Sequence, residues 1–312
     1  MPVTVFFAAG AAHWDRYRPH LQAACIAAGL DVTLSDRADD PGLVDYIIYS
    51  PGSVLTDFSP YVRCKAVLNL WAGVERIVGN ATLTQPLCKM VDPAMTSSMA
   101  VWVTGHALRH HLGIDAHILG QDGIWRGGVA PPLAHERTVA ILGIGELGRA
   151  AGQMLRGVGF RVVGWSRSAR TVPGIECHSG SAGLETVLRQ ADILVLLIPL
   201  TPDTENLLDA ARLALMPRGA FIINSGRGPL IDDAALLGAL DSGQIAHATL
   251  DVFRTEPLPP QHPFWAHPGV TVTPHIAAET RPDTAARVIA ENIRRGEAQQ
   301  PLLHRVDRTR GY

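Results

Sequence analysis

Short apolar runs alternate with amphipathic segments over the first hundred residues. Val3–Ala9 is an apolar run, and the pattern recurs over residues 31–35, 46–50 and 66–70. Between the first two runs, Trp14–Gly29 carries apolar residues at helical spacing and ends at a glycine that suits a helix C-terminus. Short strands that alternate with helical segments predict a small α/β unit with a parallel sheet.

A second α/β unit is predicted to begin at Thr138. Strands are expected over 139–142, 161–165, 193–198, 220–224, 250–253 and 270–273, and helices over 146–158 and from Pro282 to about Arg295. Between the two units, residues 94–112 form a long apolar segment that predicts a helix. Residues 113–137 are rich in Gly, Pro and His and predict an irregular arm.

Composition narrows the class of protein. A chain of 312 residues suggests about two domains, and 47% hydrophobic with 18% charged residues can build a large core. The net charge of −2 gives no basic field for nucleic acid or an anionic membrane, and no apolar run is long enough to span a bilayer. We therefore expect a soluble cytoplasmic protein, with free thiols at Cys25, Cys64, Cys88 and Cys177.

A glycine-rich turn follows the first strand of the second unit. Gly143, Gly145 and Gly148 fit G-x-G-x-x-G between a strand and a helix. The first glycine permits the tight turn, the second lets the backbone approach a pyrophosphate, and the third allows close packing of helix on strand. The N–H groups around Glu146 and Leu147 would face the anion. A glycine-rich turn without a ligand is the alternative.

The next strand ends in a basic segment. Dinucleotide sites for NAD usually carry an acidic residue about 20 residues after the glycine turn, which binds the ribose 2′-hydroxyl. This chain has Ser166, Arg167 and Ser168 there, with Arg170 nearby. Because a guanidinium attracts a 2′-phosphate, the segment predicts NADP(H), with NAD(H) less favoured. A solvated loop arginine is the alternative.

Three motifs follow successive predicted strands. They are Asn224–Gly228 (NSGRG), Asp251–Pro257 (DVFRTEP) and Thr273–Ala277 (TPHIA). The carboxyl ends of parallel strands meet at one edge of a sheet, where ligands of open α/β sheets bind. Each motif alone is weak, but their order after a dinucleotide turn points to an enzyme site.

The chain resembles the D-2-hydroxyacid dehydrogenase family over nearly its whole length. The resemblance is carried by the glycine turn, Arg227, Glu256 and His275, and extends to Trp165–Arg167, His262–Trp265 and the tail Arg310-Gly311-Tyr312. It implies an α/β fold with two Rossmann-like domains, doubly wound parallel sheets and an active site in the interdomain cleft. Residues 1–97 with 280–312 would form the substrate domain, and 98–279 the NADP-binding domain. A homodimer through the long helix and arm is also implied.

The resemblance assigns a reaction to three side chains. Arg227 would pair with the carboxylate of a 2-keto acid and polarise its ketone, and His275 would donate a proton to the developing alkoxide. Glu256 would accept a hydrogen bond from the other ring nitrogen of His275 and favour its protonated form. The implied activity is NADPH-dependent reduction of glyoxylate to glycolate and of hydroxypyruvate to glycerate.

Further contacts are implied by the resemblance alone. The substrate carboxylate would meet N–H groups of Gly73 and Val74, with Trp71 as a pocket wall or, as an alternative, a core residue. This loop departs from the family's G-x-G-x-D pattern. Cofactor contacts fall on Pro199, Thr204, Ser225 and Asp251. Asp251 would lie near the nicotinamide amide, or instead fix a loop.

Two other functions stay open. The chain could oxidise another or bulkier D-2-hydroxy acid, or act as a nucleotide-sensing protein like the corepressors that share this fold. A metal site is not expected. His106 and His110 have i, i+4 spacing on the predicted long helix, but without an obvious third ligand they favour a solvated or interface face.

Overall fold

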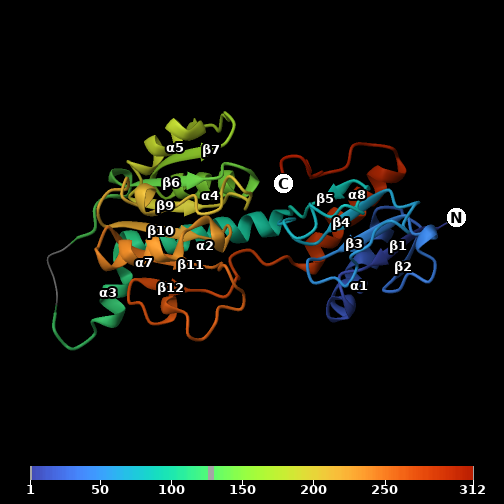
Figure 1. Cartoon of the computed structure of the whole chain (residues 1–312), viewed down its shortest axis with the longest axis horizontal. Helices are drawn as coiled ribbons and strands as arrows, with labels where there is room; N and C mark the ends of the chain where they lie inside the picture. Colours follow the sequence, from blue (N-terminus) through green and yellow to red (C-terminus); the bar gives the residue numbers. More distant parts are fainter. Residues whose placement is uncertain (1, 126–129, 312) are drawn as a thin grey trace. The chain divides into compact units, whose positions relative to one another are not determined.

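The computed structural model describes residues 2–125 and 130–311 (Figure 1). The chain divides into two compact units: Met1–Met95 with Thr280–Tyr312 is the first unit, and Thr96–Glu279 is the second unit. Residues 126–129 of the predicted arm and Tyr312 of the tail motif lie outside the described residues. The predicted assignment of one domain to substrate and the other to NADP stays a prediction.

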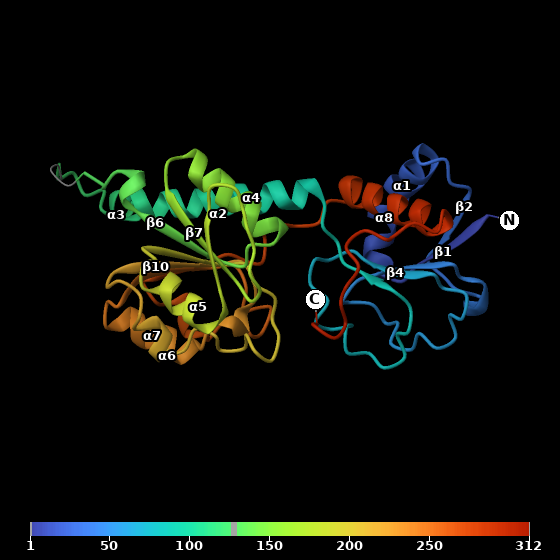
Figure 2. The ribbon, with the colours of Figure 1, turned by 90° about the horizontal axis from the view of Figure 1, so that it is seen from above.

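The first unit holds a five-stranded parallel sheet of order β2-β1-β3-β4-β5. Its elements are β1 (Val3–Phe7), α1 (Ala11–Ala27), β2 (Val32–Ser35), a 3-10 turn η1 (Pro41–Leu43), β3 (Tyr46–Tyr49), β4 (Ala66–Asn69), β5 (Leu87–Cys88) and α8 (Pro282–Glu297). Figure 2 shows α1 and α8 side by side on one face of this sheet. Loop side chains such as Phe58, Ile77 and Leu83 are buried in the core of the other face.

The end of α1 follows the glycine signal in the sequence. Gly29 has φ +70°, its N–H bonds the carbonyl of Ile26, and the N–H of Leu30 bonds that of Cys25. These two bonds pair the last helical carbonyls, and the left-handed residue between them has no Cβ to strain. The predicted helix terminus at Gly29 is confirmed.

The second unit holds a seven-stranded parallel sheet of order β12-β11-β10-β9-β6-β7-β8. Its strands are β6 (Thr138–Leu142), β7 (Arg161–Ser166), β8 (Glu176–Ser179), β9 (Ile193–Leu196), β10 (Ala220–Asn224), β11 (Ile245–Leu250) and β12 (Val270–Val272). Its helices are α2 (Pro93–Leu112, starting just before the unit), α3 (Ile114–Leu119), α4 (Glu146–Gly157), α5 (Gly180–Leu188), α6 (Ala210–Leu213) and α7 (Asp233–Asp241), with 3-10 turns η2 (Ala134–Glu136), η3 (Gly228–Leu230) and η4 (Pro263–Trp265).

Helices cover both faces of this second sheet (Figure 2). One core contains α2 and α4, through residues such as Val103 and Leu155, and the other contains α5, α6 and α7. The strand order reverses between β6 and β9, which is the switch point where doubly wound sheets bind ligands. Since all pairs are parallel, every predicted motif follows a strand at the same edge of the sheet.

Two local predictions differ from the structure. The strand expected over 250–253 is wrong, because β11 ends at Leu250 and the next residue, Asp251, uses its carboxylate to hold a loop. The predicted irregular arm starts with the helix α3. The sequence reading also missed β8 and α5, which follow each other directly, with Ser179 as the N-cap of α5 and Gly180 at φ +69°.

Two histidines of α2 are buried within the second unit, contrary to the solvated or interface face expected for this helix. The His110 ring stacks on Phe221 with centroids 4.8 Å apart, and its Nε2 lies 3.0 Å from Oγ1 of Thr249. His111 packs edge-on against Phe160. Burial, with weaker repulsion from neighbouring His247 and Arg109, lowers the pKa of His110 to about 3.

We expect His110 to make the fold sensitive to acid. An unfolded histidine binds a proton below about pH 6.5, while folded His110 stays neutral until about pH 3. Its contribution is therefore complete above pH 6.5 and is lost, by up to about 1.4 kcal/mol per pH unit, as the pH falls through this window. His110→Gln should flatten the dependence of the free energy of unfolding on pH between 6.5 and 4.5. An unchanged slope in urea titrations would contradict this.

Candidate active site

The glycine turn lies between β6 and α4 and has the geometry that each glycine was predicted to serve. Gly143 has φ +108°, and a Cβ there would lie 2.5 Å from the carbonyl oxygen of Leu197. A Cβ on Gly148 would lie 1.9 Å from the carbonyl oxygen of Gly143. A Cβ on Gly145 would meet no atom within 4 Å. Contacts within the protein thus require glycine at positions 143 and 148. At position 145 they do not, and the open space there could admit a ligand.

The start of α4 is suited to an anion. Gly145 is its N-cap, and the first intrahelical bond runs from the N–H of Arg149 to the Gly145 carbonyl. The N–H groups before Arg149 have no acceptor in the helix and lie at its positive end. The carboxylate of Glu146 pairs with Arg149 at 2.7 Å, so its contribution to phosphate binding would come from the backbone.

Ser166, Arg167 and Ser168 follow at the carboxyl end of β7, beside β6 in the sheet. Arg167 and Ser168 are exposed, and the hydroxyl of Ser166 donates to the carbonyl of Ser168 at 2.7 Å. The N–H of Gly143 bonds the carbonyl of Trp165 at 2.8 Å, which ties the glycine turn to this strand end. The residues predicted to bind the pyrophosphate and those predicted to bind the 2′-phosphate therefore lie at the carboxyl ends of two adjacent strands, β6 and β7.

The hydroxyl groups of two other predicted cofactor-binding residues form hydrogen bonds within the protein. Thr204 Oγ1 donates to the carbonyl of Pro199 and accepts from the N–H of Thr201, both at 2.8 Å, which closes the turn after β9. Ser225 is buried and its hydroxyl donates to the sulfur of Met99 at 3.2 Å. Their direct contact with a cofactor stays a prediction, while their effect on the shape of these loops is visible.

Arg227 follows β10 in a tight turn. Asn224 shapes this turn from within: its Nδ2 donates to the carbonyl of Arg227 at 3.0 Å, and its Oδ1 accepts from the N–H of Gly226 at 3.1 Å. A Cβ on Gly228 would lie 2.0 Å from the carbonyl carbon of Phe253. The backbone after Arg227 therefore packs directly on the segment that leads to Glu256, and only glycine permits that approach.

His275 and Glu256 form a hydrogen-bonded pair. Nδ1 of His275 lies 2.8 Å from Oε2 of Glu256, and Oε1 of Glu256 accepts from the N–H of Phe253 at 2.9 Å. Partial burial acts to raise the pKa of Glu256, but these hydrogen bonds and the charges of His275 and Arg227 outweigh it and lower the pKa. The carboxylate is therefore ionised at neutral pH and holds the ring with Nε2 directed away from it.

Asp251 fixes the loop that carries His275. It is buried, and its carboxylate accepts from the hydroxyl of Thr273 at 2.7 Å and from the N–H groups of Ile276 and Ala277 at 2.9 Å. The N–H of His275 bonds the Asp251 carbonyl. These contacts favour the loop-fixing alternative left open for Asp251; a contact with nicotinamide stays a prediction.

The backbone of His275 has φ +54°, in the left-handed region that non-glycine residues seldom adopt. Such strain persists only where surrounding contacts over-determine it. Here the Asp251 carboxylate supplies them. The strained backbone therefore supports a functional role for the His275 ring.

Four residues that support the predicted catalytic side chains were not identified from the sequence. They are Asn224, Gly228, Arg254 and Thr273. Arg254 donates to the carbonyl of Ile231 at 2.7 Å and to the side chain of Asn206, and so joins the Glu256 segment to the end of the turn after β9. Each of these residues lies inside a motif that was singled out. Their roles depend on partners far away in the chain, which no spacing in the motif reveals.

The predicted carboxylate loop belongs to the first unit. Trp71 is 44% exposed, which is more than a core residue shows, and Val74 is buried. Among the described residues, the N–H groups of Gly73 and Val74 donate to no protein acceptor. Neither N–H group is therefore used within the described part of the protein.

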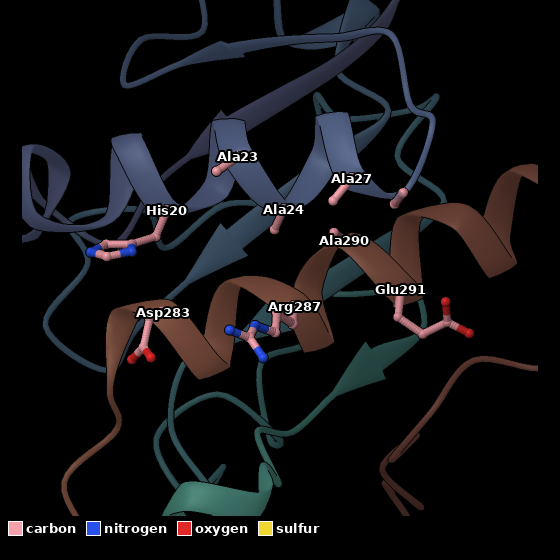
Figure 3. A pocket seen from close by; sticks show the side chains of 9 residues that line it. His20, Ala23, Ala24, Ala27, Asp283, Arg287, Ala290 and Glu291 are labelled. Atoms are coloured by element: carbon pink, nitrogen blue, oxygen red, sulfur yellow. The ribbon is translucent and has the colours of Figure 1, made fainter.

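A separate hollow lies in the first unit between α1 and α8 (Figure 3). Alanines form its floor and four polar side chains flank it: Ala23, Ala24, Ala27 and Ala290, with His20, Asp283, Arg287 and Glu291. None of the predicted site residues lines it. It is a groove between two helices of the first unit.

Two negative findings hold for residues 2–125 and 130–311. No cluster of three or more His, Cys, Asp or Glu side chains there could hold a metal ion. Within the same ranges, no helix combines the length and apolar character that crossing a membrane requires.

Comparisons with known proteins identify the family of this chain. Residues 102–277 match the family domain described as D-isomer specific 2-hydroxyacid dehydrogenase, NAD binding domain. Glyoxylate/hydroxypyruvate reductase A of Serratia proteamaculans (strain 568) is 37% identical over 312 residues, covering 95% of this chain and 98% of that protein.

Two solved structures cover the whole of this chain and 99% of their own. A D-isomer specific 2-hydroxyacid dehydrogenase from Xanthobacter autotrophicus Py2, in complex with NADPH and MES, has a TM-score of 0.91 and 42% identity. An NADPH-dependent glyoxylate/hydroxypyruvate reductase from Sinorhizobium meliloti, in complex with NADP and sulfate, has a TM-score of 0.86 and 35% identity.

A doubly wound sheet with a dinucleotide turn and an Arg, Glu and His trio at its carboxyl edge defines a nucleotide-dependent oxidoreductase. The chain belongs to the D-isomer specific 2-hydroxyacid dehydrogenase family.

Proposed function

We propose that this protein reduces small 2-keto acids with NADPH, converting glyoxylate to glycolate and hydroxypyruvate to glycerate. The observation that carries the proposal is the hydrogen-bonded His275–Glu256 pair, which shares one edge of the sheet with Arg227 and the glycine turn. The names of the relatives from Serratia and Sinorhizobium support the choice of substrates.

The residues present fit NADPH. The open space beside Gly145 and the N–H groups at the start of α4, which have no acceptor within the helix, suit a pyrophosphate, because both bring backbone donors close to an anion. Exposed Arg167 at the adjacent strand end suits a 2′-phosphate. The structures from Xanthobacter and Sinorhizobium were solved with NADPH and NADP, which supports the same cofactor here.

When bound, NADPH supplies a hydride to the carbonyl carbon of the keto acid. Arg227 pairs with the substrate carboxylate and draws electron density toward the ketone oxygen. His275 donates the proton at Nε2 that turns the alkoxide into a hydroxyl. Glu256 accepts from Nδ1, so the ring is oriented and its positive charge is balanced before the transfer.

The first test is oxidation of NADPH, and separately of NADH, by the purified protein. Glyoxylate, hydroxypyruvate, pyruvate and a branched 2-keto acid would be compared by kcat/KM. Fast turnover of the first two with NADPH supports the proposal. Turnover of the branched acid alone would retain the reaction and change the substrate. Binding of NADPH without turnover of any acid would favour a nucleotide sensor.

Cofactor preference should depend on Arg167. In Arg167→Asp, an attractive charge at the 2′-phosphate becomes a repulsive one, so kcat/KM with NADPH should fall about 10- to 100-fold, while NADH is less affected. Arg189→Asp is the matched control, because it makes the same charge change at the far end of α5. Equal losses with both cofactors in Arg167→Asp would contradict the assignment.

We also propose a cytoplasmic homodimer. Exposed apolar side chains follow one another along α2, α3 and the segment after them, among them Leu119 at 86% and Trp125 at 96% exposure. Large apolar side chains exposed in succession are typical of an interaction surface. The four free cysteines suit a reducing compartment. The mass in solution, and a cell fractionation with the native chain, test the two statements.

A further inference from the structure

The loop after β4 has most of its carbonyl groups tied into the first unit. The hydroxyl of Thr280 donates to the carbonyl of Leu70 at 2.9 Å, and the N–H of Met90 donates to that of Trp71 at 3.0 Å. The carbonyl of Val74 accepts from Ile77 and Val78. The loop therefore has a fixed shape rather than that of a free surface segment.

Asn69, the last residue of β4, is the side chain that bridges this loop. It is 1% exposed, and its Nδ2 donates to the carbonyls of Trp71 and Gly73, each at 2.8 Å. Two carbonyl partners settle the amide orientation, because Oδ1 at the same place would repel both oxygens. Oδ1 is buried without a partner among the described residues, a cost that the two donated bonds offset.

The side-chain contacts of Asn69 use carbonyl groups of the loop and not its N–H groups. The carbonyls of Trp71 and Gly73 are turned toward Asn69, while the N–H groups of Gly73 and Val74 have no acceptor among residues 2–125 and 130–311. Successive N–H groups of this kind attract an anion. The stretch from Leu70 to Val74 carries no lysine or arginine, so any attraction for an anion that this stretch supplies comes from its backbone.

We propose that Asn69 is a positioning residue that holds the Trp71–Val74 loop in the shape that binds the substrate carboxylate. The inference deepens the proposed function and rests on it for the identity of the anion as a small 2-keto acid. Asn69 acts through the loop backbone and touches no reacting atom.

The test uses the full-length protein with bound NADPH and the non-reducible keto-acid isostere oxamate. Asn69→Leu has a similar size and no donor, and should raise the Kd of oxamate and the KM of glyoxylate about tenfold or more. Asn69→Ser keeps one donor and should fall between. The Kd of NADPH should stay within about twofold in both, since the glycine turn belongs to the second unit. Asn292→Leu, which alters another buried asparagine of the first unit, is the matched control and should leave oxamate binding unchanged.

A second readout separates positioning from general loosening. Methylglyoxal offers a carbonyl but no carboxylate, so the preference for glyoxylate over methylglyoxal in kcat/KM should shrink about tenfold in Asn69→Leu. Unchanged oxamate affinity in that variant, or an equal loss in Asn292→Leu, would overturn the inference. If the wild type binds oxamate but reduces no keto acid, the proposed function fails while the oxamate comparison still decides the role of Asn69. Absence of oxamate binding in the wild type would overturn both.

Discussion

His275→Asn should nearly abolish turnover while leaving NADPH bound. His275 adopts φ +54°, a region in which asparagine is also tolerated, so the loop held by Asp251 can keep its shape. The amide N–H is a far weaker acid than an imidazolium, so it is a poor proton donor to the developing alkoxide. We expect kcat for glyoxylate to fall by about 10²- to 10⁴-fold, the usual contribution of a positioned acid. The measurement is kcat at saturating NADPH, with cofactor affinity from fluorescence titration.

His267→Asn is the matched control for this prediction. His267 also pairs with a carboxylate, its Nε2 lying 3.2 Å from Oδ1 of Asp241, but it follows η4 and lies outside the three motifs. Its variant should retain turnover within a few-fold. If His275→Asn kept more than a tenth of the wild-type kcat, the proton would have to come from another group, and the assignment of His275 would be wrong.

Two alanine substitutions in the glycine turn should have opposite consequences. Gly145 has ordinary extended backbone and an open space beside it, so Gly145→Ala should fold normally. The new methyl group would occupy the approach of the pyrophosphate and weaken its hydrogen bonds. Because a hydrogen bond to a charged group contributes about 1.5–3 kcal/mol, we expect NADPH affinity to fall about 10- to 100-fold.

Gly148→Ala should instead destabilise the protein. Its Cβ would lie 1.9 Å from the Gly143 carbonyl oxygen, so α4 must move away from the turn, at about 3 kcal/mol or more. Urea unfolding without cofactor separates the two variants. Normal NADPH affinity in Gly145→Ala would show that no ligand uses this space, and normal stability in Gly148→Ala would show that the helix can shift freely.

Much of the fold was predictable because strong local signals agreed. Apolar runs placed β1, β3, β4, β6, β9 and β10 within one or two residues of their bounds, and Gly29 marked the end of α1. Predictions failed where local signals were short or absent. The strand expected over 250–253 is apolar enough to pair, but the partners of Asp251 in the next loop end β11 first.

The histidines on α2 show that helix periodicity does not predict which polar residues are buried. Their spacing suggested a polar helix face, yet His110 and His111 are buried against aromatic rings from Phe221 and Phe160. Burial of a neutral histidine depends on what other elements bring to it, so helix periodicity alone cannot decide it. The same holds for Thr204 and Ser225, whose hydroxyls are used by their own surroundings.

The sequence by itself determined the class of protein and the identity of the chemical groups. A glycine turn between strand and helix, a basic segment in place of an acid, and Arg227, Glu256 and His275 in order are local patterns with direct chemical meaning. Only the tertiary structure decided how these groups are held. The His275–Glu256 bond, the Asp251 loop and the Asn69 bridge join residues through backbone geometry, which depends on the packing of the whole unit.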